Sequence, residues 1–116
     1  MANLPNYFRD FMKSETLQPL ETKTLISERW IGFNGICFLL GVGIQDMPLW
    51  ANSEFNVLIN GIHQLDYGKI VDRIGSIDLM TPVNIFLPAG CTIEFIARNG
   101  GASPSIFMGR LQCQTL

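Results

Sequence analysis

Asn60-Gly61 lies between two segments in which apolar and polar residues alternate, EFNVLI before it and IHQLD after it. Both central residues of a type I′ turn need a positive φ, which asparagine and glycine adopt at low cost, so this dipeptide predicts a two-residue β-hairpin. Ile59 is then expected opposite Ile62. Phe55, Val57 and Ile59 share one face of their strand, and we expect that face in the core. A hairpin at the centre of the chain indicates antiparallel β-structure.

The second half of the chain carries further turn signals between alternating segments. The sequence LPAG places a proline and a glycine at the corners of a turn, between strands predicted over residues 81–87 and 91–98. The segment NGGASP, residues 99–104, is expected to be a hairpin loop before a last strand over residues 105–113. This spacing of short strands and turns is typical of an all-β domain.

The first half adds strand-like segments of other kinds. Residues 22–30 alternate weakly, and residues 36–40 form the continuous apolar run ICFLL, as in a strand buried on both faces. Residues 67–76 are open to two interpretations, a short strand or a loop. The whole pattern predicts one domain over residues 22–116, an antiparallel β-sandwich or jelly-roll-like fold of about seven or eight short strands.

The first 21 residues differ from the rest. Phe8, Phe11 and Met12 stand at i, i+3 and i+4, which predicts a short amphipathic helix within residues 6–14. Such a helix is too short to be stable alone, so it must dock either on its own domain or on a partner subunit. We therefore expect an N-terminal arm over residues 1–21, extended or helical, without which the β-domain still folds.

The composition excludes several classes of partner. The formal net charge is −2 and the eight basic residues are scattered, so the clustered positive charge of a nucleic-acid-binding protein is missing. The apolar run Ile31–Ile44 is too short to cross a bilayer, and no secretory signal opens the chain, so a membrane protein is not expected. Only 16% of residues are charged, against about 25% in typical domains. We interpret that shortage as a surface covered by another subunit, with a neutral monomer as the alternative.

The residue types needed for catalysis or metal binding are scarce. His63 is the only histidine, which rules out a metal site built from several histidines, and nothing pairs it with a cysteine nucleophile. Cys37, Cys91 and Cys113 are three cysteines without CxxC spacing, as expected of reduced core thiols in a protein made in a cytosol. The pair Gly41 and Gly43 lacks the remaining features of a dinucleotide fingerprint. We expect no enzyme, no cofactor and no metal.

Aromatic and apolar side chains are the better candidates for function. Trp30 and Trp50 are interpreted as buried anchors of the core or of an interface. The alternative is that both tryptophans form a sugar-binding platform with Tyr67. Our candidate interface residues are Tyr7, Phe8, Phe11, Met12, Trp30 and Trp50.

The stretches FNVLINGIHQLDYG and DLMTPVNIFLPAGCTIEFIARNGG resemble the small β-sandwich proteins that decorate or cement the capsids of tailed bacteriophages. The shared features are a strand ending in Asn-Gly, a proline-led apolar strand, an LPAG-type turn and a Thr-Ile-Glu-Phe strand. The resemblance covers residues 53–110, about half the chain. It implies a non-enzymatic virion protein, a homotrimer assembled in the host cytoplasm and bound to the major capsid protein on the capsid exterior, where capsid subunits meet.

Two other functions stay open at this point. One is a carbohydrate- or receptor-binding module of a virion head or tail, with glycans as ligands. The other is a small connector or tail component, which a ring of copies in solution would favour. Exposure of the tryptophans separates the first of these from capsid decoration, because a sugar platform needs open aromatic faces.

Overall fold

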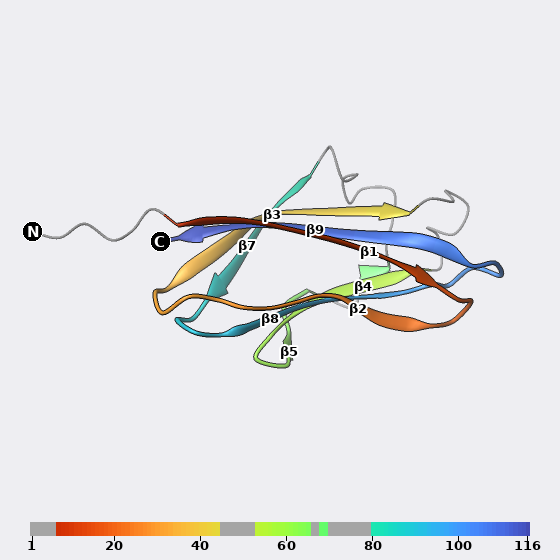
Figure 1. The fold of residues 1–116 in the computed structure, drawn as a ribbon, viewed down its shortest axis with the longest axis horizontal. Helices are drawn as coiled ribbons and strands as arrows, with labels where there is room; N and C mark the ends of the chain where they lie inside the picture. The colour runs from red at the N-terminus through yellow and green to blue at the C-terminus, as the bar shows by residue number, and fades with distance from the viewer. Residues whose placement is uncertain (1–6, 45–52, 66–67, 70–79) are drawn as a thin grey trace, which may run out of the picture.

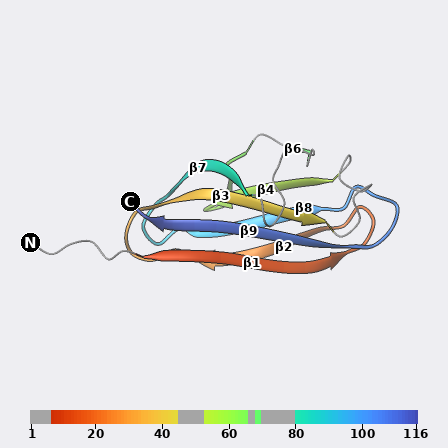
Figure 2. The same ribbon diagram turned by 90° about the horizontal axis from the view of Figure 1, so that it is seen from above.

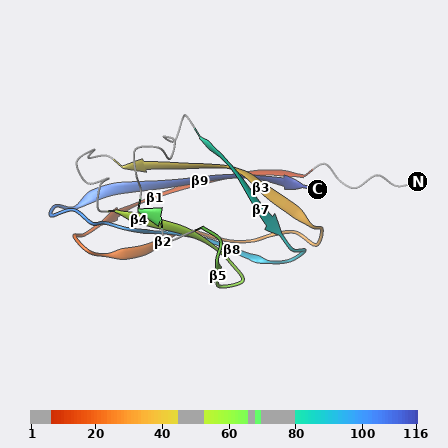
Figure 3. The same cartoon turned by 180° about the vertical axis from the view of Figure 1, so that it is seen from behind.

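The computed structural model describes residues 7–44, 53–65, 68–69 and 80–116, which form nine β-strands in two antiparallel sheets. Sheet A has the strand order β1-β9-β3-β7, and sheet B has the order β2-β8-β4-β5, with β6 also paired to β4. The strands are β1 (Phe8–Leu17), β2 (Thr22–Arg29), β3 (Gly35–Ile44), β4 (Glu54–Ile59), β5 (Ile62–His63), β6 (Gly68–Lys69), β7 (Thr81–Leu87), β8 (Thr92–Arg98) and β9 (Ser105–Thr115). Figures 1 and 3 show the two sheets as two layers. The predicted all-β, sandwich-like class is confirmed.

The strand pairing is nested around the central hairpin. β4 pairs with β5 across residues 60–61, and outside that pair lie β3 with β7, β2 with β8 and β1 with β9. Two further pairings, β3 with β9 and β4 with β8, complete the sheets. Because β8 belongs to sheet B and β9 to sheet A, residues 99–104 connect the two layers. The predicted hairpin loop at residues 99–104 is therefore wrong, since both a hairpin and a crossover need the same turn residues.

The predicted turn at Asn60-Gly61 is confirmed in detail. Asn60 and Gly61 have φ values of 51° and 80°, and Ile59 lies opposite Ile62. Phe55, Val57 and Ile59 are all buried, as the alternation predicted. The local sequence decides this element because only a few residue types accept its two left-handed positions.

The predicted helix in residues 6–14 is wrong for the part that the structure describes. Residues 8–17 are strand β1, which pairs with β9 from Phe8 opposite Gln114 to Leu17 opposite Ser105. A strand has a period of two, so Phe8 and Met12 point outward while Phe11 and Leu17 enter the core. The edge of β9 offers a ladder of hydrogen bonds that a two-turn helix cannot match in number.

The core lies between the sheets and is apolar. Its residues are Phe11, Leu17, Leu25, Ile26, Trp30, Cys37, Leu40, Val42, Ile44, Phe55, Val57, Ile59, Ile85, Leu87, Cys91, Ile93, Phe95, Ala97, Phe107, Leu111 and Cys113. The three cysteines are free and buried, as predicted. The apolar run at residues 36–40 is buried on one face only, because a β-bulge turns Phe38 and Leu39 outward, where they are half-buried. Residues 67–76 lie outside the described part, apart from β6.

Candidate interaction surfaces

The outward side chains of sheet A form the largest candidate surface, here called the sheet A face. Figure 2 shows its four strands side by side, with β7 and β1 at the two edges. The register places apolar residues on this face from every strand, namely Phe8, Met12, Ile36, Phe38, Leu39, Pro82, Phe86, Ile106 and Met108. Phe8, Met12 and Phe86 are 50%, 52% and 51% exposed. Apolar side chains this exposed on one sheet face are typical of a protein-binding surface.

A row of outward side chains, three apolar and one polar, crosses one end of the sheet A face. Phe8 lies opposite Gln114, Gln114 opposite Ile36, and Ile36 opposite Phe86 on the four successive strands. The Phe8 ring also contacts the Phe38 ring, with the centroids 6.1 Å apart. Phe8 is 50% exposed despite this contact, whereas Phe38 is half-buried, so apolar surface of Phe8 remains for a partner to cover.

One ion pair supplies all the charge of the sheet A face. Asp10 and Arg110 are the only ionisable residues among the outward side chains of the described strands of this sheet. Arg110 donates from Nε and Nη2 to the two Asp10 carboxylate oxygens at 2.9 and 2.7 Å. The hydrogen bonds from Arg110 hold the pKa of Asp10 below its usual range. The sheet A face therefore has no net charge near neutral pH.

The sheet edges carry features that oppose the addition of another strand. On β1, Lys13 and Glu15 point to the inner side of sheet A but stay exposed at its margin. On β7, Pro82 lacks an amide hydrogen, and β2 is bulged at Leu25. Inward charges, prolines and bulges on edge strands are common protections against edge-to-edge pairing. The face of sheet A carries no such protection.

The turn between β1 and β2 holds a strained, exposed leucine. Leu20 has a φ of 65° and its side chain is 64% exposed. Its amide donates to the carbonyl of Asn99 at 2.7 Å, and the amide of Glu21 donates to the carbonyl of Gln18 at 3.0 Å. Glycine is the usual residue at the left-handed position of such a turn. Leu20 thus exposes an apolar side chain at one end of the molecule.

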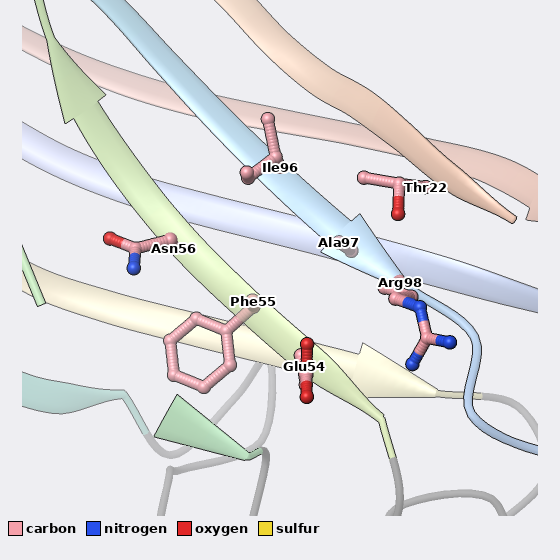
Figure 4. Close-up of a pocket in the computed structure, with 7 residues that line it drawn as sticks. All are labelled: Thr22, Glu54, Phe55, Asn56, Ile96, Ala97 and Arg98. Atoms are coloured by element: carbon pink, nitrogen blue, oxygen red, sulfur yellow. The ribbon is translucent and has the colours of Figure 1, made fainter. Parts of the chain in front are cut away.

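A cleft of about 220 Å³ lies between strands β2, β8 and β4 of sheet B. It is lined by Thr22, Glu54, Phe55, Asn56, Ile96, Ala97 and Arg98 (Figure 4). The amide of Asn56 is occupied within the fold, because Nδ2 donates to the Leu65 carbonyl at 3.0 Å and Oδ1 accepts from the Val57 amide at 2.9 Å. The cleft is smaller than most ligand pockets, which are about 300–1,000 Å³.

The structure separates the predicted interface residues into three groups. Phe8 and Met12 lie on the sheet A face, whereas Phe11 and Trp30 are core residues; Trp30 is only 2% exposed. Tyr7 is half-buried and packs edge-on against Trp30, with ring centroids 5.3 Å apart. Trp50 lies outside the described residues. Spacing alone identified Phe8 and Met12, but with a helical period that wrongly placed Phe11 beside them.

Sequence reasoning missed the other half of the sheet A face. Phe86 and Ile106 were read only as strand residues, because their outward direction depends on which strands pair. The structure shows Ile85 buried with Asn84 and Phe86 exposed on either side, and the strand-like segment at residues 81–87 was the available signal. Alternation in a strand shows that neighbouring side chains point to opposite faces of the sheet, but it does not show which face the core covers.

Among the residues that the structure describes, the reactive types do not gather into a site. Cys37 and Cys113 lie opposite each other inside the core, and their hydrogen bond together with burial raises the pKa of the Cys113 thiol. Burial also raises the pKa of the Cys91 thiol, so neither Cys91 nor Cys113 has the exposed thiolate character of a reactive cysteine. His63 is exposed on β5. Within the described ranges no three His, Cys, Asp or Glu residues are placed to hold a metal ion.

No protein-family model matches this chain, and no curated protein matches it in sequence. In the part of the chain that the structure describes, no helix has the length and apolarity to cross a bilayer.

Proposed function

We propose that this protein is a structural component of a virus particle that acts by packing against protein surfaces. The observation that carries the proposal is the sheet A face, which exposes large apolar side chains from its strands and has no net charge. Burial of such a surface against a partner lowers the free energy, because apolar area is removed from water. A surface without net charge does not attract nucleic acid or an anionic membrane. Its natural partners are other proteins with apolar faces.

The nested strand pairing supports a finer assignment of the fold, the jelly roll. Eight strands that pair first with last, second with second-last and so on, and then roll into two sheets, have this topology; here β5 and β6 share one position. Jelly rolls occur in viral capsid proteins, in lectins and in cupins. Fold analogy alone does not choose among them, so the choice depends on the surface.

The surface favours the capsid over the lectin. A sugar platform formed by Trp30, Trp50 and Tyr67 is not supported, because Trp30 is buried beneath Tyr7. Together with the resemblance noted above, this favours a decoration protein bound to the major capsid protein on the exterior of the particle. The resemblance further implies three copies per unit. Such a protein stabilises the shell by mass action, because it binds the assembled lattice and not the free subunits.

The test is co-sedimentation with empty shells assembled from the major capsid protein of the same virus. We expect the protein to sediment with the shells and to raise their melting temperature in a concentration-dependent way. A protein that leaves both the sedimentation and the melting of shells unchanged, and that is retained by a glycan array, contradicts capsid decoration and supports the carbohydrate-binding alternative.

A further inference from the structure

The sheet A face has the size of one half of a protein–protein interface. Its strands contain 10, 11, 10 and 7 residues. At about 3.3 Å per residue along a strand and about 4.8 Å between strands, the face covers on the order of 600 Å². Two such faces in contact bury roughly 1,200 Å², the lower limit of a standard specific interface.

The shape of the face suits another sheet of the same kind. The inner side of sheet A already packs on sheet B, and the outer side carries large apolar residues among the polar side chains of Ser14, Thr16, Asn84, Gln112 and Gln114. Twisted sheets stack face to face at about 10 Å with strands inclined by about 30°. A second copy of this chain offers a sheet of matching length and chemistry.

The Asp10–Arg110 ion pair fits a two-fold contact. A face with one positive and one negative group side by side is electrostatically complementary to itself when a second copy is turned by 180°. Asp10 of each copy then faces Arg110 of the other, and the four charges alternate in sign. A partner with any net charge at this place gains less, because the pair is already neutral as a whole.

Because the strand edges are protected, we expect the assembly of two copies to be closed. Strand addition at β1, β7 or β2 is opposed by Lys13 and Glu15, by Pro82 and by the bulge at Leu25. Association through the face alone uses the same patch on both copies, so it ends at two.

We propose that two copies of this chain pack the sheet A face of one against the sheet A face of the other, related by a two-fold axis close to Arg110. This inference rests on the proposed function as an assembly protein and assigns the sheet A face to a second copy, so the dimer contacts the capsid through its remaining surface. It differs from the trimer that the resemblance implies.

The test is the mass in solution by sedimentation equilibrium, at about 100 µM and in dilution below it, since an interface at the lower limit of the standard size is expected to be weak and to dissociate on dilution. We expect twice the chain mass of 13.0 kDa for the natural protein. Phe86→Asp places a carboxylate inside the contact and is expected to raise the dissociation constant at least a hundredfold, leaving monomers. Ile62→Asp is the matched control, because Ile62 is 67% exposed on sheet B; this variant should remain dimeric.

Three outcomes overturn the inference: a monomeric natural protein, a mass of three chains, or a dimer that Ile62→Asp weakens as much as Phe86→Asp does. Unchanged far-UV circular dichroism shows that Phe86→Asp still folds. If the dimer depends on Phe86 but does not bind shells, the capsid proposal fails and the dimer stands. If the natural protein is a monomer that binds shells, the dimer inference fails and the capsid proposal stands.

Discussion

At the scale of single residues, Leu20 shows a conflict between stability and exposure. Its left-handed backbone costs about 1–2 kcal/mol for a residue with a Cβ, and its exposed side chain offers little packing in return. We therefore predict that Leu20→Gly raises the free energy of unfolding by about 1 kcal/mol, measured by urea denaturation. Leu20→Ala keeps the strain and should show no such gain. A loss of stability in Leu20→Gly would contradict this account of the turn.

Gly109 shows the opposite case, a residue with no room for a methyl group. A Cβ at this position lies 2.7 Å from Cδ1 of the Phe95 ring, in the centre of the core. We predict that Gly109→Ala lowers the free energy of unfolding by about 1–3 kcal/mol, the usual effect of overpacking. Gly32→Ala is the matched control, since nothing lies within 4 Å of its Cβ position. Equal melting temperatures for the two variants would contradict this prediction and would show that the Phe95 ring moves away from the added methyl group at no cost.

Asp10 gives the chain a defined response to acid. Its pKa is lowered in the folded protein by the hydrogen bonds from Arg110, so its contribution to stability is present above the unfolded value of about 3.9 and is lost as the pH falls below it. We predict a small extra loss of stability, less than about 1 kcal/mol, between about pH 6 and pH 3, because the pair is partly exposed. Asp10→Asn should lack this component. The measurement is urea unfolding at both pH values for both proteins.

At the scale of strands, β1 decides whether the N-terminal segment is an arm or part of the domain. Leu17 is fully buried and Phe11 almost so, and both extend the core of sheet A. We predict that Leu17→Ala costs about 3 kcal/mol in free energy of unfolding, and that deletion of residues 1–21 unfolds the protein instead of only weakening attachment. Lys13→Ala, at the margin of the same strand, should change stability little. A cooperative thermal melt of the truncated protein would contradict this prediction and would show that residues 1–21 are an arm separate from the domain.

The same strand shows how far sequence reasoning reaches at this scale. The Asn60-Gly61 hairpin was predictable because its two residues determine the turn without help from the rest of the chain. β1 was not, because its apolar residues fit a helical period, and the free edge of β9 that converts it to a strand is about a hundred residues away. Local sequence determines a turn, whereas a strand that pairs with it from far along the chain decides whether an ambiguous segment becomes a strand or a helix.

At the scale of the whole molecule, the limits of prediction have the same cause. Alternation predicted which residues of β4 face the core, and the structure confirms it. It did not predict the distribution of strands between two sheets, since a turn such as LPAG serves a crossover as well as a hairpin. The sheet A face depends on that distribution, because Phe8, Ile36 and Phe86 meet only when β1, β9, β3 and β7 lie side by side.

The central claim, that two copies meet through the sheet A face, is tested most directly by a single engineered cysteine. Met12→Cys puts a thiol next to Arg110 and the proposed axis, while Cys37, Cys91 and Cys113 are buried and should not compete. With oxidised glutathione, the account predicts a disulfide-linked dimer of Met12→Cys on a non-reducing gel and no such dimer for Ile62→Cys. Equal cross-linking of the two variants, or none of Met12→Cys, would contradict it.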